Sequence, residues 1–453
     1  MYTTPTTLKN TVVSYNLVHG TKKVFHDGGS IYNLSANPGS SFDHNYVYDN
    51  HNTVGLYLDE GSRYVTLTNN VIQDSGVWAF TNANPTNNTD DNTFTTNWYN
   101  TGATQVATGT PHNNILNGNV QVTGGTWPLA AQQVIYNAGI EPALRTSADS
   151  QPAPAGVALT AVPASISTGG STVLTGTVQD FAAPGLSDVT LSLTVPSRWT
   201  AARLSGPPHT VKGGGTATAT WRVTAPGTAT APISSAAVTL NATYRSTGRS
   251  YTGSASAQIA ETGGLTDLRS FGSVPSVFGQ AGNDYAILTG GNDIWGAGGE
   301  HFDEYGTIYR PQGAGPNATV TVQVTAQQAV DPWSKAGLVI RNDVTAPGVA
   351  QGYAALVVTP GNGVSLQWQD AATPGYLDQD AVSAGVKAPV WLRLVRNSGQ
   401  VSGYYSTDDT TWTQVGSAVS LAGAAATEDA GMIATAHSPT AQGEADFTAF
   451  AVS

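Results

Sequence analysis

The stretch "TNNVI" (68–72) has an asparagine at its centre and apolar residues behind it, and four similar segments occur in the first third of the chain. The five segments are "SYNLV" (14–18), "DHNYV" (43–47), "TNNVI" (68–72), "TNWYN" (96–100) and "NGNVQ" (117–121). The recurring asparagine is the third residue of each segment, except in "TNWYN" where it is the second, and successive ones are separated by 29, 25, 27 and 22 residues. A period in the twenties with one short strand per unit is typical of a solenoid, in which each repeat forms one coil.

The repeated asparagines predict a ladder along the solenoid axis. An asparagine at one place in every coil can stack its amide on the amides above and below it. This interpretation gives these residues a structural role rather than a functional one. The residues concerned are Asn16, Asn45, Asn70, Asn97 and Asn119.

On this coil period and these asparagine-centred strands, residues 5–145 resemble the right-handed parallel β-helix of secreted polysaccharide-active enzymes. That group includes both glycoside hydrolases and lyases, so the resemblance implies a fold and leaves the reaction open. We expect this domain to span residues 1–146. The opening "MYTTPTTLKN" reads as an arbitrary entry point into a longer sequence, so we expect a β-helix truncated at its N-terminus.

The stretch "TWPLAAQQVIYNAG" (126–139) predicts a helix that covers the open edge of the last coil. Thr126 can cap it, Pro128 suits its first turn, and Gly139 suits a left-handed stop. The apolar residues expected to face the last coil are Leu129, Val134 and Ile135.

Two coils carry a matching acidic motif, "VFHDGGSIY" (24–32) and "LYLDEGSRY" (56–64). The match aligns Asp27 with Asp59 and Phe25 with Tyr57, and adjacent coils lie roughly 4.8 Å apart. We therefore expect the two carboxylates to be stacked neighbours. Strand alternation places one set of residues inside and the next set outside. The expected inward set is Val54, Leu56 and Leu58, and the expected outward set is Gly55, Tyr57 and Asp59.

An outward pair of carboxylates indicates glycoside hydrolysis. Their repulsion should make one hold its proton more tightly, which gives one acid and one base or nucleophile. Phe25 and Tyr57 would offer ring faces on which a sugar can stack, and Glu60 is a reserve catalytic acid. The competing interpretation is that "DGG" and "DEG" are only repeated corners, because Asp and Gly both favour turns.

Two further residues complete the predicted substrate-binding set on this wall. His26 has an inward parity and favours a structural role, and Arg63 is a basic residue beside the acids. A polysaccharide lyase would need a basic residue to abstract a proton. Because such residues are few here, we rank a lyase below a hydrolase.

After a linker rich in Ser, Pro and Ala (147–159), regular short strands predict a β-sandwich over residues 153–260. The expected strands include 171–180, 188–195, 216–226 and 234–245. The stretches "VPSRWTA" (195–201) and "GTATATWRVTAP" make this region resemble the immunoglobulin-like module associated with alpha-galactosidases. Such a module implies a spacer.

The final segment, residues 263–453, resembles a concanavalin-like jelly roll appended to bacterial carbohydrate enzymes. The likeness rests on stretches such as "WSKAGLVIRND" (333–343) and "VWLRLVRNSGQVSGYYSTDDTTWTQVG" (390–416). It implies a carbohydrate-binding module, for which Trp295, Trp333, Trp368 and Tyr376 are candidate platforms. Among them, Trp368 and Tyr376 are favoured as exposed, whereas Trp295 and Trp333, with Trp391, are expected in the core.

Composition restricts the class of partner. The formal net charge is −12 and only 11% of residues are charged, which argues against nucleic acid and leaves an uncharged partner such as a glycan. The absence of cysteine is compatible with export, and no stretch is long and apolar enough to span a membrane. We expect no cofactor, because the "STDDTT" stretch (406–411) is more typical of a turn than of a Ca²⁺ site.

Together these features describe an all-β, modular, extracellular bacterial protein that carries no signal peptide in this chain. The leading functional hypothesis is a glycoside hydrolase acting on a polysaccharide through Asp27 and Asp59. The alternatives are a non-catalytic glycan-binding or adhesion protein and a polysaccharide lyase.

Overall fold

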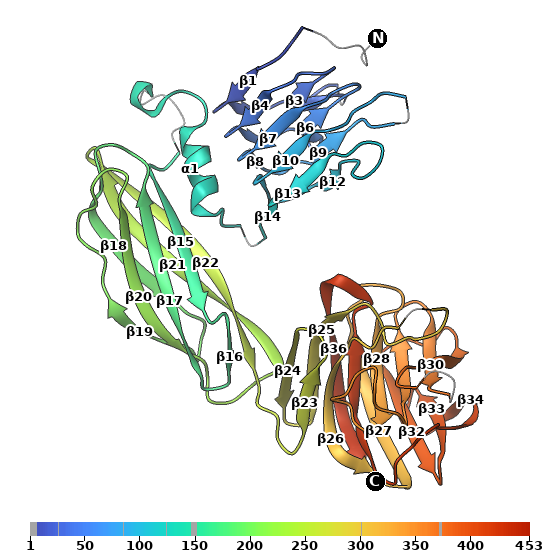
Figure 1. Ribbon diagram of the computed structural model, residues 1–453. Helices are drawn as coiled ribbons and strands as arrows, with labels where there is room; N and C mark the ends of the chain where they lie inside the picture. Colours follow the sequence, from blue (N-terminus) through green and yellow to red (C-terminus); the bar gives the residue numbers. More distant parts are fainter. Residues whose placement is uncertain are drawn as a thin grey trace.

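The computed structural model describes residues 7–25, 27–84, 86–123, 125–145, 152–299, 301–370 and 374–453. The protein is all-β, as expected. It has a β-solenoid followed by two β-sandwiches in chain order (Figure 1).

Three parallel sheets form the walls of the solenoid. The first contains, in spatial order, β1 (Val12–Ser14), β4 (Ser40–Asp43), β7 (Val65–Thr68), β10 (Thr93–Thr95) and β13 (Ile115–Asn117). The second contains β14 (Val120–Gln121), β11 (Trp98–Tyr99), β8 (Val71–Ile72), β5 (Tyr46–Tyr48) and β2 (Leu17–His19). The third, called here the third wall, contains β12 (Ala103–Gln105), β9 (Val77–Thr81), β6 (Val54–Leu58) and β3 (Gly29–Asn33).

The predicted asparagine ladder is confirmed at every step. The amide nitrogen of each asparagine donates to the amide oxygen of the next, at 2.9 Å in all four steps from Asn16 to Asn119. Asn45, Asn70 and Asn97 are fully buried. Each coil is therefore joined to the next by side-chain hydrogen bonds in addition to its strand pairing. A shorter ladder that we did not predict links Asn92 to Asn114 at 3.0 Å.

The solenoid interior is apolar, and the parity predicted for β6 is mostly confirmed. Leu56 and Leu58 are fully buried in the core. Gly55, however, was expected to face outward, and that expectation is wrong. A Cβ added to Gly55 would lie 2.6 Å from Cγ2 of Ile72, another core residue, so this position faces the interior. Because strand pairing between β6 and its neighbours skips Gly55, the simple alternation fails there.

The predicted helix exists as α1 (Leu129–Asn137), but it does not cover the end of the solenoid. Val134 packs with Val71 and Trp98 on the outer face of the second wall, so the helix lies along the side of the coils (Figure 1). Pro128 occupies the N-cap position with no side-chain hydrogen bond, so Thr126 is not the cap. Gly139 has the expected left-handed conformation (φ 86°), and its N–H donates to the carbonyl of Tyr15 in the first coil.

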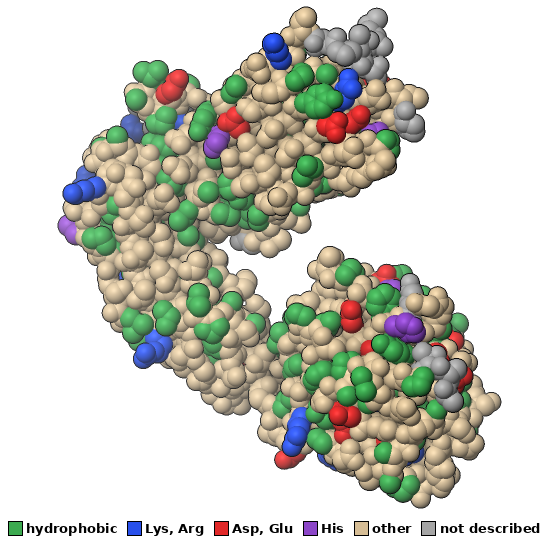
Figure 2. Space-filling view, in the orientation of Figure 1, with side chains coloured by type: hydrophobic (Ala, Val, Ile, Leu, Met, Phe, Trp, Pro, Cys, Tyr) green, Lys and Arg blue, Asp and Glu red, His purple; other side chains and the backbone are tan. Residues whose placement is uncertain are grey.

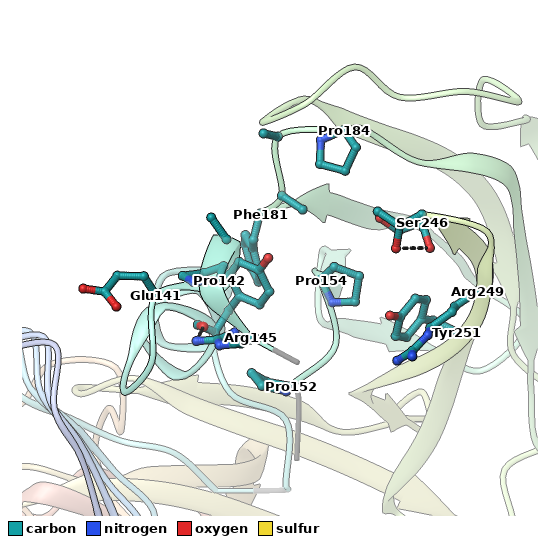
Figure 3. A pocket seen from close by; sticks show the side chains of 15 residues that line it. Glu141, Pro142, Arg145, Pro152, Pro154, Phe181, Pro184, Ser246, Arg249 and Tyr251 are labelled. Carbon is teal, nitrogen blue, oxygen red and sulfur yellow. Dashed lines mark hydrogen bonds between the residues drawn. The ribbon is translucent and has the colours of Figure 1, made fainter. Parts of the chain in front are cut away.

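A cavity of about 670 Å³ lies where the segment after α1 meets the first sandwich (Figure 3). The segment includes the short 3-10 helix η1 (Pro142–Leu144). Figure 3 shows Pro142, Pro154, Phe181 and Tyr251 around this space. Proline and aromatic side chains therefore line the joint between the segment after α1 and the first sandwich.

The first sandwich packs two four-stranded sheets around a core that includes Trp221 and Tyr244. The four predicted strands are confirmed to within two residues at each end. One sheet contains β15 (Ala155–Val162), β17 (Ser171–Asp180), β20 (Thr216–Thr224) and β19 (Thr200–Ser205). The other contains β16 (Ser165–Ser167), β22 (Arg249–Thr262), β21 (Ile233–Ser246) and β18 (Ser187–Thr194).

The second sandwich has two seven-stranded sheets. The first, called here the front sheet, contains β23 (Arg269–Gly272), β26 (Gly306–Ala314), β35 (Glu428–Thr435), β28 (Lys335–Arg341), β29 (Ala354–Thr359), β30 (Gly363–Trp368) and β31 (Gln379–Ser383). The back sheet contains β24 (Ser276–Ala281), β25 (Asp284–Gly291), β36 (Ser438–Val452), β27 (Asn317–Gln327), β32 (Val390–Asn397), β33 (Gln400–Ser406) and β34 (Thr413–Ser420).

The front sheet is covered on both faces. One face packs on the back sheet through a large apolar core. The other carries a second cluster in which Ile294 and Tyr305, from the segment after β25, pack against Val339 and Val357. That segment therefore shapes the outer face of the front sheet.

Charged side chains are sparse on the face of the molecule in Figure 2, where neutral polar groups and backbone dominate. Within the part of the chain that the structure describes, no helix is long and apolar enough to cross a membrane.

The asparagine ladder predicts that a substitution in its middle destabilises the protein more than one at its end. Asn70→Ala should lower the free energy of unfolding by about 3 kcal/mol, because buried partners in both neighbouring coils lose their hydrogen bonds. Asn16→Ala, at the exposed end of the ladder, should cost less than about 1 kcal/mol. Thermal unfolding of the two variants compares them, and equal losses would contradict a cooperative ladder.

Candidate functional site

The third wall of the solenoid presents a row of aromatic side chains. Tyr32 of β3 is in register with Tyr57 of β6, which is in register with Phe80 of β9. The rings meet edge to face, with centroids 5.3 Å apart for Tyr32 and Tyr57 and 4.7 Å apart for Tyr57 and Phe80. Tyr57 faces outward as predicted, but its neighbours leave only 9% of it exposed. Tyr32, which is 44% exposed, is therefore the ring that a ligand would meet first.

Asp59 follows β6 and accepts hydrogen bonds from several sides. The hydroxyl of Tyr32 donates to one carboxylate oxygen, and the amide of Asn82 donates to the other at 2.7 Å. The hydroxyl of Tyr57 lies 3.4 Å from that second oxygen, and the N–H of Glu60 donates to it at 2.8 Å. The acid is thus tied to three coils and to its own corner.

These contacts set the protonation of the cluster. Burial raises the pKa of Asp59, but the hydrogen bonds from Tyr32, Asn82 and the Glu60 backbone outweigh it, so its pKa lies below the usual value. Burial, followed by the negative charge of Asp59, raises the pKa of Tyr57 to about 12. Asp59 is therefore a carboxylate at neutral pH, flanked by neutral phenols.

The predicted stacking of Asp27 on Asp59 is wrong. The strands pair Ile31 with Leu56 and Tyr32 with Tyr57, an offset of 25 residues rather than the 32 of the matched motifs. Asp27 consequently precedes β3, whereas Asp59 follows β6, at opposite ends of neighbouring strands. Each carboxylate accepts from the N–H of the next residue, which is the corner role of the competing interpretation.

The other predicted residues of this wall are placed as follows. Phe25 is not in register with Tyr57 and is 81% exposed. Glu60 is half-buried in the corner after Asp59, and the guanidinium of Arg63 lies 5.7 Å from the ring of Tyr64. His26 lies outside the described residues. Asp27 lines a shallow hollow with Lys22, Gly28, Gly29 and Tyr32.

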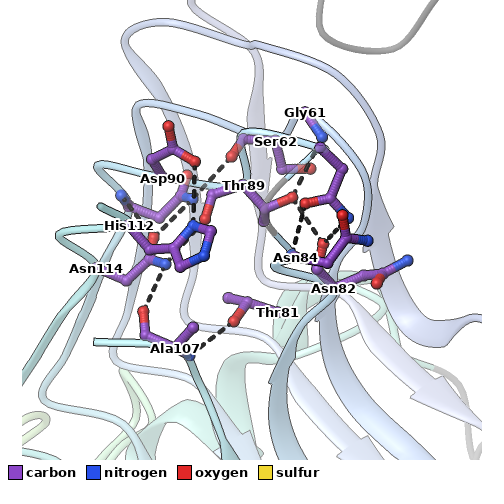
Figure 4. Close-up of polar contacts among 12 residues, drawn as sticks. Gly61, Ser62, Thr81, Asn82, Asn84, Thr89, Asp90, Ala107, His112 and Asn114 are labelled. Atoms are coloured by element: carbon purple, nitrogen blue, oxygen red, sulfur yellow. Dashed lines mark hydrogen bonds and ion pairs between the residues drawn. The ribbon is translucent and has the colours of Figure 1, made fainter. Parts of the chain in front are cut away.

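The interior behind Asp59 is a polar corner that we did not predict (Figure 4). Thr89 lies between Asn82 and Asp59, with its hydroxyl 3.3 Å from the carbonyl of Asp59, and Asp90 pairs with His112 at 3.5 Å. The hydroxyl of Thr89 donates to the carbonyl of Asn82 at 3.0 Å. This corner connects Asp59 to the coil below and supports a structural role for part of the cluster.

A better-formed hollow lies on the outer face of the front sheet of the second sandwich. Its volume is about 270 Å³. We call it the front cavity, and its lining combines two indoles with charged and amide groups. The lining residues are Asp293, Trp295, Trp333, Lys335, Gln367, Asp380 and His437.

Three of these residues form a charged cluster. The ammonium of Lys335, whose side chain is 2% exposed, pairs with Asp293. His437 lies between two acids, 3.4 Å from Asp293 and 3.2 Å from Asp331. Burial lowers the pKa of Lys335, and the nearby charge of Asp293 opposes that shift. Lys335 also lies 5.8 Å from the ring of Trp333, which is 36% exposed.

Strand β30 and Gln369, the residue that follows it, carry unpaired polar atoms at alternate positions. Ser365, Gln367 and Gln369 are almost fully buried, yet their side chains include polar atoms without a hydrogen-bond partner among the described residues. The intervening Val364 and Leu366 point into the core between the sheets. Buried polar groups without partners are rare, so each one needs an explanation.

The alternation of side chains along β30 also changes which aromatic residues are candidate sugar-binding platforms. Trp368 has the parity of Leu366 and packs against the core between the sheets, so it is not an exposed platform. Tyr376 is half-buried beside His301, with ring centroids 4.9 Å apart, and does not line the front cavity. Trp333, which we expected in the core, lines the cavity instead, whereas Trp295 lines the cavity and also packs against the apolar cluster on the outer face.

The stretch 406–411 covers the last residue of β33 and the turn that leads to β34. The carboxylate of Asp408 accepts from the N–H groups of Thr410 and Thr411 at 2.9 and 2.7 Å, and from the hydroxyl of Ser406. These contacts hold the pKa of Asp408 below its usual range.

Comparisons with known proteins identify no family. The chain matches no protein-family model and no curated protein. A functionally unknown protein from Saccharomyces cerevisiae is 19% identical, with a TM-score of 0.34 over 41% of this chain and 96% of that one. The GH43 protein BlXynB from Bacillus licheniformis is 13% identical, with a TM-score of 0.30 over 58% of this chain and 64% of that one.

A third similar structure is the lumenal domain of VIP36 in its Ca²⁺-bound form. It is 9% identical, with a TM-score of 0.27 over 41% of this chain and 84% of that one. At such scores these likenesses assign neither a family nor an activity. The chain spans less than two thirds of the length of the Bacillus protein.

The hydrogen bonds of Asp59 predict a pH dependence. A lowered folded-state pKa means that its stabilisation is present above about pH 4, the unfolded value, and is lost as the pH falls. Asp59→Asn should therefore be less stable than the wild type at pH 7, with the difference shrinking toward pH 3. Tyr32→Phe, which removes one donor, should show a smaller effect of the same sign. Calorimetric unfolding between pH 3 and 7 measures both, and a difference independent of pH would contradict this role.

Proposed function

We propose that this protein binds glycans, and that the front cavity is the binding site. The observation that carries the proposal is the combination of an exposed indole, Trp333, with the unpaired buried amide oxygen of Gln367 in one hollow. Ligand sites typically join aromatic walls to a few placed polar groups. A volume of about 270 Å³ suits a single sugar ring, which could stack on Trp333.

The proposal extends to the organisation of the chain. We infer a glycan-directed modular protein with a right-handed parallel β-helix at 1–146, an immunoglobulin-like spacer at 153–260 and a concanavalin-like binding module at 263–453. The three parallel walls and the two sandwiches support this division. We also place the protein outside the cell, and its lack of cysteine supports this location.

Removing the indole tests the binding site. Trp333→Ala should weaken glycan binding about tenfold or more, because it deletes the ring on which the sugar stacks. The matched control is Trp412→Ala, whose ring packs under Arg393 outside the cavity. A glycan array followed by titration calorimetry measures both. Loss of binding in the control alone, or in neither variant, would contradict the proposal, provided that thermal unfolding shows both proteins folded.

Hydrolysis on the third wall is a second candidate function. Its specific support is that the charges of both Asp27 and Asp59 act on the hydroxyls of Tyr32 and Tyr57, so both acids flank one aromatic patch. Asp59, held as a carboxylate, would serve as base or nucleophile, and the exposed Asp27 would serve as acid. Glu60 is the reserve acid. A lyase is the less favoured variant, with Lys22 as the basic group beside Asp27.

Reducing-sugar assays on neutral and acidic polysaccharides test this candidate. If the wild type is a hydrolase, Asp27→Asn and Asp59→Asn should each lower kcat at least a hundredfold, because acid–base assistance contributes about that much. Products that absorb in the ultraviolet as unsaturated uronates would indicate a lyase instead. Unchanged activity in both folded variants would exclude these acids as catalytic residues.

A further inference from the structure

We propose that Gln367 and Asp380 form the part of the front cavity that selects the sugar, by binding adjacent hydroxyl groups and repelling acidic sugars. This inference rests on the proposed glycan-binding function and adds the chemical class of the ligand, a neutral sugar. It follows from the register of two strands, the pairing of their side chains and the charge of the lining.

Gln367 of β30 and Asp380 of β31 are directly opposite each other in an antiparallel pair. Opposed residues in such a pair have Cβ atoms about 5 Å apart on the same face of the sheet. Both side chains line the front cavity. At this separation, two neighbouring hydroxyl groups of one sugar ring could reach the two side chains, one hydroxyl to Gln367 and the other to Asp380.

Both groups are available to a ligand. Gln367 is only 3% exposed, and its amide oxygen has no hydrogen-bond partner among the described residues. The carboxylate of Asp380 is exposed, and no described group donates to it or forms an ion pair with it. A hydroxyl group can donate to an amide oxygen and to a carboxylate. A ligand with two hydroxyls would satisfy both groups at once.

The unpaired amide is costly in the absence of a ligand. Leaving a buried polar group without a partner costs about 1–3 kcal/mol, which an apolar residue at the same position would avoid. The same outer face of the front sheet buries the apolar Val339 and Val357, so it does not require a polar side chain at position 367. A bound hydroxyl would account for the cost.

The charge of Asp380 disfavours an acidic ligand in the front cavity. Two carboxylates of the lining, those of Asp293 and Asp380, face two basic groups, Lys335 and His437, and Asp331 pairs with His437 from outside the lining. The lining itself holds the carboxylates of Asp293 and Asp380 against the ammonium of Lys335, so it is negative while His437 is neutral, and that ammonium is already paired with Asp293. Asp380 is the unpaired negative charge, so the carboxylate of a uronic acid placed beside Gln367 would meet it directly.

Titration calorimetry with matched methyl glycosides tests the inference on the full chain. The panel contains the neutral, uronic and 2-amino forms of the gluco, galacto and manno sugars. We expect the wild type to bind at least one neutral form about tenfold or more tightly than its uronic form. Asp380→Asn should reduce that preference to about threefold or less. Asp267→Asn, at an exposed position outside the cavity, is the matched control and should leave it unchanged.

A second variant separates binding from folding. Gln367→Val should weaken binding of the neutral sugar about tenfold while its melting temperature stays equal or rises, because it removes the unpaired amide. Gln379→Val, on the exposed neighbouring position of β31, should leave binding unchanged.

The outcomes distinguish the two proposals. Absence of binding to any sugar on the panel and on a polysaccharide array would overturn the glycan-binding function itself. Binding of neutral and uronic forms with equal affinity, or a preference for the amino form, would overturn the selection by Gln367 and Asp380 while the binding function stands. A fall in the melting temperature of Gln367→Val would show that the amide is structural and would also overturn the inference.

Discussion

A β-strand sends alternate side chains to opposite faces of its sheet, and both candidate sites in this protein depend on that rule. On β6 it buries Leu56 and Leu58 while Tyr57 faces outward to its partners Tyr32 and Phe80. On β30 it sends Leu366 into the core and Gln367 into the front cavity. Which side chains then meet depends on the register between strands, which no single strand determines.

This distinction explains what could be predicted from the sequence. The asparagine ladder was predictable because each coil repeats one local unit, and stacking the units brings equivalent residues together. The strands of the first sandwich were predictable from alternation alone. The pairing of Asp27 with Asp59 was not, because the matched acidic motifs lie at corners. The strands between those corners pair with an offset that places Tyr32, not Phe25, beside Tyr57.

The front cavity was harder to predict for a related reason. Its residues come from five separate parts of the chain, including the loop after β25, the start of β28 and the segment after β35. Trp333 and Trp368 both read as plausible platforms in the sequence. Placing Trp368 in the core needs two facts: the alternation of side chains along β30, and which face of that strand the back sheet covers. The signal that could have identified the site was the alternation of Ser365, Gln367 and Gln369 with apolar residues.

The two sites also differ in how far their polar groups are already satisfied. Asp59 accepts from Tyr32, Asn82 and the backbone of Glu60, so its carboxylate is stabilised without any ligand. Gln367 retains an unpaired buried oxygen, so its environment is incomplete until a donor arrives. A group that is already fully hydrogen-bonded gains little by binding, whereas an unsatisfied one gains the whole of its missing bond. This asymmetry is the physical reason for placing ligand recognition in the second sandwich and a largely structural role in the solenoid corner.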